Sequence, residues 1–283
     1  VMESNMNERI SSEIIGISPG KSILGIDAGS TRIKGALWTG SSWTLYAISS
    51  GVSYEKGVSD LTRNILESAD LSPETIVATG YGRKMISGVS SIQNEIGCHA
   101  KGAMYLAPGC RTVIDIGGQD AKVISLREDG KVSDFAMNDK CAAGTGRFLS
   151  IMADALSITL ADLGTIGTEV NPLRLSSMCT VFAESEIIGL LSQGYPVPEI
   201  VAGINDAIAR RTLSLASRLT LIPEVIFTGG VSANSDIVSR ISALVNLNIS
   251  VPQHAEFSGA IGAVLSVGTV EPWQKVQVSV LQS

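Results

Sequence analysis

Two cysteines, Cys141 and Cys179, stand in sequence contexts that suit metal binding. Cys141 is followed by the glycine-rich stretch Ala-Ala-Gly-Thr-Gly and then by an apolar pattern with helical spacing over residues 147–156. Cys179 lies at the start of a second such pattern within residues 176–194. The free amides and the macrodipole at the start of a helix favour the thiolate, which is the form that ligates metal. We therefore expect both cysteines to head helices and to bind metal; the alternative is that both are small buried side chains.

The helices that must position these thiols can be outlined from their apolar positions. The first helix is predicted to bury one face, formed by Phe148, Leu149, Met152 and Leu156. The second is predicted to bury Val181, Phe182, Ile187, Ile188 and Leu191. Its candidate N-caps are the nearby hydroxyl residues Ser176, Ser177 and Thr180.

An Asp-x-Gly pattern occurs twice in the chain with the same spacing. An apolar strand ends at Asp27, and a Gly-Ser-Thr turn leads to a second strand from Ile33 to Trp38, which predicts a hairpin. Ile26, Asp27, Gly29 and Lys34 return in register as Ile114, Asp115, Gly117 and Lys122. Backbone amides at such a turn can bind phosphate, and an aspartate can hold Mg²⁺ directly or through water. One copy is a weak signal, because Asp and Gly are common in turns, but two copies predict two similar lobes that share a phosphate-binding cleft.

The composition limits the class of protein. A chain of 283 residues with few aromatics, 29 glycines and short Val/Ile runs between glycine turns predicts an α/β fold of two domains. The net charge of −6 and the lack of a Lys/Arg cluster argue against nucleic acid as a partner. Four irregularly spaced cysteines and no signal peptide indicate a reducing cytoplasm. The longest apolar stretch, Phe257 to Val270, is shorter than the roughly 20 residues that span a bilayer, so we expect a soluble protein without membrane contact.

The other segments predict the elements that surround these motifs. Residues 1–21 read as a loose arm with a strand-like stretch at 14–17. Helices are predicted at 61–71, 91–107 and 199–222, and a strand at 74–83 that ends in a Thr-Gly-Tyr-Gly turn facing the cleft or a partner. Residues 224–238 predict a strand, a Gly229-Gly230 turn and a helix capped by Ser232 or Asn234. Such a strand, turn and helix can bring the backbone close to a nucleotide. The alternative is an ordinary strand-to-helix turn without a ligand.

Small residues at 258–268 predict a helix that packs closely against another helix where the lobes meet and hinge. The remaining two cysteines are not predicted to be ligands of the metal site. Cys98 beside His99 invites a metal interpretation, but no second pair lies nearby, so a buried position inside a helix is favoured. Cys110 precedes the strand 112–116 and therefore lies at the end opposite the Asp115 turn.

Four segments in order, LGIDAGSTRIKGAL, VIDIGGQDAKVI, VIFTGGVSAN and FSGAIGAVL, resemble motifs of the acetate and sugar kinase, Hsp70 and actin superfamily. The resemblance implies two duplicated ribonuclease-H-like lobes with a nucleotide cleft between them. With NDKCAAGTGRF and SMCTVFAESEI it narrows to the ATP-dependent activators (component A) of 2-hydroxyacyl-CoA dehydratases and their benzoyl-CoA reductase relatives, the BadF/BadG/BcrA/BcrD type. It covers residues 22–268 and implies an arm at 1–21, lobe I at 22–112 with a helix at about 255–270 packing back on it, and lobe II at 113–254.

The resemblance also implies a set of site residues. Phosphate contacts fall on Gly29, Ser30, Thr31 and Lys34 in the first motif, and on Asp115, Gly117, Gly118 and Gln119 in the second. Adenosine contacts fall on Gly229 and Gly230, and we include Gly144, Thr145, Gly146 and Gly259 among the nucleotide-binding positions. Mg²⁺ is expected at Asp27 and Asp115, and Gln119 is the first candidate to orient water, followed by Asp120. Cys141 and Cys179 of two subunits would together hold one [4Fe-4S] cluster.

The function implied is electron transfer driven by ATP. A homodimer would take one electron from ferredoxin or flavodoxin, and ATP binding would change the angle between the lobes before transfer to a dehydratase or reductase partner. A small-molecule kinase of the same superfamily, acting on a sugar or a carboxylate, is the alternative, but it leaves the cysteine motifs unexplained. A third hypothesis is a nucleotide sensor with negligible ATP turnover.

Overall fold

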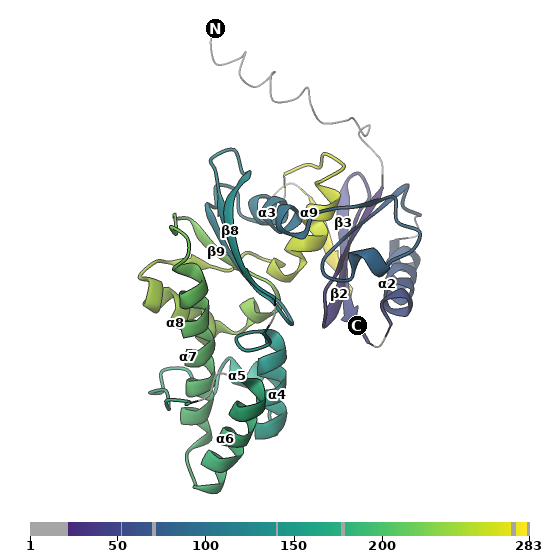
Figure 1. Cartoon of the computed structure of the whole chain (residues 1–283). Coiled ribbons are helices and arrows are strands. Elements are labelled where there is room, and N and C mark those ends of the chain that lie inside the picture. The colour runs from purple at the N-terminus through teal and green to yellow at the C-terminus, as the bar shows by residue number, and fades with distance from the viewer. Residues whose placement is uncertain are drawn as a thin grey trace.

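The computed structural model describes residues 22–51, 53–69, 72–139, 141–176, 179–272 and 276–281. The predicted arm at 1–21 and the candidate cap Ser177 lie outside the described residues. The strands form two separate sheets, and most of the helices lie beside the second sheet or extend away from it (Figure 1). No helix in the described ranges is both long enough and apolar enough to cross a membrane.

The first sheet has six strands in the order β11-β3-β2-β1-β4-β5. Its strands are β1 (Ile23–Ala28), β2 (Arg32–Trp38), β3 (Ser42–Ser49), β4 (Thr75–Thr79), β5 (Ser91–Ile92) and β11 (Gln277–Val280). Helix α2 (Tyr54–Ala69) packs its Leu61 and Ile65 against one face, where Leu24 and Ile26 point. Helix α9 (Ser258–Val264) covers the opposite face, where Ile23 points. The two faces alternate along β1 because successive side chains in a strand point to opposite sides.

The second sheet has five strands in the order β10-β9-β6-β7-β8. These are β6 (Thr112–Ile116), β7 (Ala121–Leu126), β8 (Val132–Asn138), β9 (Val225–Thr228) and β10 (Ile249–Ser250). Helix α3 (Glu95–Leu106) covers one face. The other face packs against α4 (Gly146–Leu156), α7 (Val197–Ala216) and α8 (Ser235–Val245). The short α5 (Leu160–Leu163) and α6 (Thr180–Ser192) complete the helical part, which extends away from the sheet (Figure 1).

The predicted duplication of the phosphate hairpin is confirmed by the strand register. In the hairpin of β1 and β2, Asp27 lies opposite Lys34; in the hairpin of β6 and β7, Asp115 lies opposite Lys122. Each hairpin continues through a parallel neighbour on its other side, β4 for β1 and β9 for β6. The two sheets therefore repeat one arrangement around the same Asp-x-Gly turn.

The lobes meet where α3 crosses α9 (Figure 1). A Cβ on Gly102 would lie 1.8 Å from the Ser258 carbonyl oxygen, and a Cβ on Gly262 would lie 1.7 Å from the Cys98 carbonyl oxygen. The close packing predicted for the small residues of α9 is thus confirmed. Helix α9 ends at Val264, earlier than predicted. Helix α3, which falls in the predicted lobe I, packs against the second sheet and also contributes Cys98 and Leu106 to the core cluster of the first sheet.

Three predictions about individual elements were wrong. The helix expected from residue 91 begins at Glu95, because the side chain of Asn94 caps it and Ser91–Ile92 pairs with β4 as strand β5. Phe182 and Ile188 of α6 are 67% and 51% exposed, whereas Ala183 and Ile187 are buried. The N-cap of α6 is Cys179 itself, without a side-chain hydrogen bond. The α6 face was misjudged because apolar residues occur on all sides of this helix, so spacing alone did not select the buried side.

Candidate nucleotide cleft and cysteine site

A cleft of about 390 Å³ lies between the two phosphate hairpins. Both turns line it, together with the turn after β9 and the beginning of α4. Of the predicted nucleotide contacts, those that line it are Asp27, Gly29, Ser30, Thr31, Lys34, Asp115, Gly117, Gly118, Gln119, Gly146, Gly229 and Gly230. Gly144, Thr145 and Gly259 are not among the lining residues. One concave site therefore collects most of the residues singled out from separate parts of the sequence.

The two turns approach each other directly across this cleft. A Cβ on Gly118 would lie 2.0 Å from Thr31 Oγ1, so only glycine allows the second turn to come this close to the first. Gly229 has φ of +83°, and a Cβ there would lie 2.4 Å from the Ile116 carbonyl oxygen. Glycine at both positions leaves backbone amides near the space that a phosphate would occupy.

The two aspartates are buried but differ in their surroundings. Lys34 Nζ lies 3.6 Å from Asp27 Oδ2, and the Lys34 side chain is 12% exposed toward the cleft. Asp115 accepts a 2.7 Å hydrogen bond from Thr228 Oγ1 and faces His99 Nδ1 at 3.2 Å and Lys122 Nζ at 3.5 Å. Burial alone would raise the pKa of Asp115, but His99 and Lys122 lower it well below its ordinary value.

Lys122 lies at the centre of a buried charge cluster. Its Nζ is 2.7 Å from Asp120 Oδ2, 3.0 Å from Glu95 Oε1 and 3.5 Å from Asp115 Oδ1. Burial opposes the charged form, yet the three carboxylates raise the pKa of Lys122 above its ordinary value. The Lys122 side chain is 2% exposed, so its ammonium group contacts these carboxylates and has little access to solvent.

Cys141 and Cys179 are exposed, whereas Cys98 and Cys110 are buried. Cys179 directly precedes α6, as expected, but α4 begins only at Gly146, so a loop separates Cys141 from that helix. Burial raises the pKa of Cys110 to about 11. The buried positions of Cys98 and Cys110 confirm that they are ordinary core cysteines.

The first turn of α4 is attached to the second phosphate turn by two backbone hydrogen bonds. The Gly146 amide donates to the Gly117 carbonyl at 2.9 Å, and the Arg147 amide donates to the Gly118 carbonyl at 2.8 Å. The loop that carries Cys141 continues directly into this turn, because the Thr145 amide and hydroxyl both bond the Ala142 carbonyl. These contacts connect the second phosphate turn to the loop that carries Cys141.

Comparison with known proteins agrees with this geometry. The sequence matches the BadF/BadG/BcrA/BcrD ATPase family over residues 24–267. The chain belongs to this ATPase family. It is 42% identical over 248 residues to the 2-hydroxyisocaproyl-CoA dehydratase activator of Clostridioides difficile, covering 86% of this chain and 93% of the relative. It is 41% identical over 251 residues to the (R)-2-hydroxyglutaryl-CoA dehydratase activating ATPase of Acidaminococcus fermentans, covering 86% and 95%.

Solved structures place the ATPase family in a wider fold class. The Clostridium difficile activator with bound ADPNP superposes with a TM-score of 0.83 at 40% identity, covering 87% of this chain and 94% of the other. At 12% identity, the hexokinase of Thermus thermophilus and MreB 5 of Spiroplasma citri superpose with TM-scores of 0.50 and 0.51, which show the fold alone. The α/β fold of the actin, Hsp70 and sugar-kinase type is thus confirmed.

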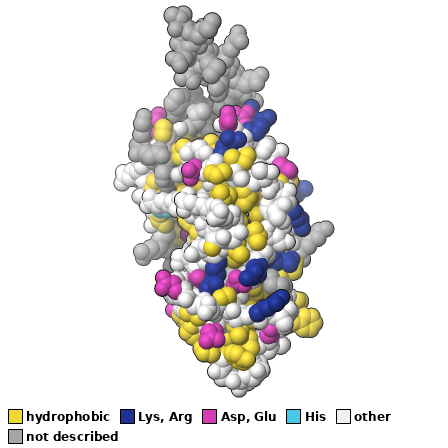
Figure 2. Space-filling model, turned by 90° about the vertical axis from the view of Figure 1, so that its left-hand side faces the viewer, with side chains coloured by type: hydrophobic (Ala, Val, Ile, Leu, Met, Phe, Trp, Pro, Cys, Tyr) yellow, Lys and Arg dark blue, Asp and Glu magenta, His cyan; other side chains and the backbone are white. Residues whose placement is uncertain are grey.

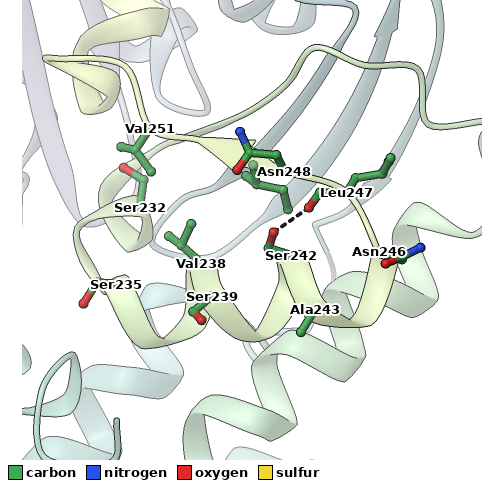
Figure 3. Close-up of a pocket in the computed structure, with 11 residues that line it drawn as sticks. Ser232, Ser235, Val238, Ser239, Ser242, Ala243, Asn246, Leu247, Asn248 and Val251 are labelled. Atoms are coloured by element: carbon green, nitrogen blue, oxygen red, sulfur yellow. Dashed lines mark hydrogen bonds between the residues drawn. The ribbon is translucent and has the colours of Figure 1, made fainter. Parts of the chain in front are cut away.

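A second hollow of about 840 Å³ lies outside this ATPase cleft, between α8 and β10 (Figure 3). Serine and asparagine side chains line it, with no charged residue. Ser242 bonds the Leu247 carbonyl, and Ser232 bonds the Gly229 carbonyl. Because five of the lining residues are apolar and none is a cation, this hollow does not suit a nucleotide.

Figure 2 shows how the charged side chains are distributed on one face of the molecule. Lys and Arg side chains there are interspersed with Asp and Glu and with hydrophobic side chains (Figure 2). A continuous basic surface, which phosphate backbones need, is absent from this face.

Sequence reasoning did not assign Glu95 and His99 to the ATPase cleft. Tyr81 is 66% exposed and lines the cleft, which resolves the predicted Thr-Gly-Tyr-Gly turn in favour of the cleft. Glu95 and His99 lie one turn apart on α3 and both face the buried charges. The spacing of these two polar residues on a largely apolar helix was the available signal.

Proposed function

We propose that this protein is an ATP-hydrolysing iron–sulfur activator that passes a low-potential electron to a 2-hydroxyacyl-CoA dehydratase or a related acyl-CoA reductase. The observation that carries the proposal is the combination, in one chain, of a duplicated phosphate cleft and two exposed cysteines, of which Cys141 lies on the loop that leads from the cleft into α4. The names of two relatives, a dehydratase activator and a dehydratase activating ATPase, support it. A kinase would need the cleft but not the cysteines.

ATP would lie in the cleft with its phosphates on the two turns. The amides of Ser30, Thr31 and Gly118 would bind phosphate oxygens, because those of Gly29 and Gly117 donate within their own turns, and Lys34 would add a charge-assisted contact. Magnesium typically keeps several waters and uses one or two carboxylates besides phosphate, which fits Asp27 and Asp115. Since the Asp115 oxygens already meet His99, Lys122 and Thr228, its contact to a cation would be through water.

Gln119 remains our first candidate to orient the attacking water. It is exposed and lines the cleft, whereas Asp120 is held 2.7 Å from Lys122 and is therefore less available. Gln119→Ala should reduce ATP turnover while leaving nucleotide affinity nearly unchanged, because the side chain would act on water and not on ATP. Turnover equal to that of the wild type would remove Gln119 from the mechanism.

Cys141 and Cys179 would hold the cluster in a homodimer. Among the described residues of one chain, no three His, Cys, Asp or Glu side chains are grouped to hold a metal ion, but two exposed thiols from each of two chains supply the four thiolates of a [4Fe-4S] cluster. A bound cluster supplies a one-electron carrier whose potential depends on charge, hydrogen bonding and exposure. The exposed Phe182, on the first turn after Cys179, offers apolar surface that a second chain could cover.

The coupling would run through the chain's own contacts. ATP that binds both turns favours the conformation in which the turns lie close together, so it shifts the population toward that conformation. Because Gly117 and Gly118 are bonded to the first turn of α4, this shift would reposition the Cys141 loop and the surface that meets the partner enzyme. Ferredoxin or flavodoxin would supply the electron in the reducing cytoplasm, and hydrolysis would make the transfer effectively one-way.

The test is the content of iron and acid-labile sulfide in anaerobically purified protein, with its molar mass in solution. A homodimer with about two irons per chain is expected, and Cys141→Ser should lose this iron. Cys110→Ala is the matched control, because a buried cysteine outside the site should not affect iron content. No iron after anaerobic reconstitution, with ATP turnover stimulated by a small hydroxyl or carboxylate compound, would favour the kinase.

A further inference from the structure

His99 is a buried imidazole at the crossing of α3 and α9. It is 5% exposed, lines the floor of the cleft and has had no role in the steps described above. Helix α3 packs on the second sheet and α9 on the first, and the two helices touch backbone to backbone around Gly102 and Gly262. Any change in the angle between the lobes therefore passes through the immediate surroundings of this ring.

One ring nitrogen is bound from both lobes. Nδ1 lies 3.2 Å from Asp115 Oδ2 and 3.2 Å from Ser258 Oγ at the start of α9. Asp115 Oδ2 also accepts from Thr228, so His99 and Thr228 together fix the orientation of that carboxylate. Because His99, Asp115 and Thr228 are all buried, the Asp115 carboxylate has little freedom to turn.

The other ring nitrogen, Nε2, lies beside Gly259, which also adjoins the first aspartate. The position of a Cβ on Gly259 would lie 3.1 Å from His99 Nε2 and 2.8 Å from Asp27 Oδ2. The imidazole ring therefore contacts Asp115 through Nδ1 and lies near Asp27 on its other side. Because Gly259 has no side chain, the space between the ring and Asp27 stays open. His99 is placed where the carboxylates of the two phosphate turns converge.

We infer that His99 is a positioning residue that fixes the Asp115 carboxylate, and with it the placement of Mg²⁺ between the two phosphate turns. The inference rests on the proposed function, because it takes the cleft to bind a magnesium nucleotide. His99 touches neither nucleotide nor metal in this role; it acts through Asp115. Removing its Nδ1 contact should weaken the effect of Mg²⁺ on nucleotide binding without weakening binding of the nucleotide alone.

The test is calorimetric titration of the purified chain with ADP, in the presence and absence of Mg²⁺. Three variants separate the two ring nitrogens: His99→Asn keeps an amide N–H near the position of Nδ1, His99→Gln keeps one near Nε2, and His99→Leu keeps neither. We expect Mg²⁺ to tighten ADP binding in the wild type and in His99→Asn. In His99→Gln and His99→Leu that tightening should fall by about tenfold, the effect of one charge-assisted hydrogen bond. Affinity for ADP alone should stay within about twofold in all variants.

Ser258→Ala is the matched control, because it removes the other partner of the same nitrogen but leaves Asp115 in place. It should keep the wild-type response to Mg²⁺. An equal loss of affinity with and without Mg²⁺ in the folded His99 variants would overturn the inference in favour of a general packing role. Wild-type Mg²⁺ dependence in folded His99→Gln would also overturn it, while the nucleotide site would stand. A wild-type protein that binds no ADP under either condition would instead overturn the proposed nucleotide site, and the inference with it.

Discussion

The crossing of α3 and α9 offers a sharp test of how tightly the lobes are joined. Gly102→Ala places a Cβ 1.8 Å from the Ser258 carbonyl oxygen, where contacts below 3.0 Å require something to shift. The atom in the way belongs to the backbone of α9, so no side chain can rotate to make room. The two helices must separate, and α9 carries the packing of the first sheet with it.

The expected cost follows from two opposing effects. Overpacking a core costs about 1–3 kcal/mol, and a backbone obstacle places this change near the upper end, at about 3 kcal/mol. Alanine in place of glycine inside a helix returns about 1 kcal/mol. Gly102→Ala should therefore lower the free energy of unfolding by about 2 kcal/mol, a large fraction of the roughly 5–15 kcal/mol of a typical domain.

Urea denaturation followed by circular dichroism measures this change, and Gly97→Ala on the same helix is its control. A Cβ on Gly97 would meet only Asn94 Oδ1 at 3.8 Å, an ordinary contact, so that variant should be neutral or up to about 1 kcal/mol more stable. If Gly102→Ala were as stable as Gly97→Ala, the close contact between the lobes that underlies the proposed hinge would be refuted.

Three further outcomes are expected. Lys34→Met should weaken ATP binding by about tenfold to a hundredfold in calorimetry, because it removes a cation that lines the cleft; unchanged affinity would contradict the proposed phosphate contact. Burial alone would raise the pKa of Asp115, but its neighbours lower it. The carboxylate therefore stabilises the fold at pH values above its unfolded pKa of about 4, and this stability is lost as pH falls below that value. Asp115→Asn should accordingly be less stable at pH 7 in urea titrations and lose less stability than the wild type toward pH 3; parallel losses would speak against this assignment. Iodoacetamide at pH 8, followed by mass spectrometry of iron-free native protein, should label the exposed Cys141 and Cys179 and spare Cys110, whose pKa burial raises to about 11; early labelling of Cys110 would contradict its buried position.

The sequence was sufficient for the duplicated hairpins because their signal is local. An Asp-x-Gly turn between two apolar strands specifies its own geometry, and the matching lysine five positions after the glycine repeats the same cross-strand register. The Gly229-Gly230 turn and the cap at Asn234 were predictable for the same reason. Each of these features depends on residues that are close in the chain.

Other features could not be predicted, because they depend on contacts between distant residues. The short strand β11 exists through its pairing with β3, and its four residues carry no decisive pattern of their own. The role of Glu95 depends on Lys122 and Arg83, which reach it from β7 and from the turn after β4. Phe182 was assigned to the buried side of α6 because apolar residues occur all round that segment, whereas the packing against α4 selects Ala183 and Ile187.

The lysines of the two hairpins, Lys34 and Lys122, differ in their contacts and in their exposure. Lys34 has one carboxylate partner at 3.6 Å and remains partly exposed to the cleft, so it can turn to a phosphate at little cost. Lys122 is held by Glu95, Asp115 and Asp120 and is almost fully buried, so removing it would leave charges unpaired in the interior. The first turn can therefore adapt to the ligand, while the second turn is rigid. Because the rigid turn is the one bonded to α4, a ligand that draws the turns together would move the Cys141 loop as a unit instead of deforming the turn.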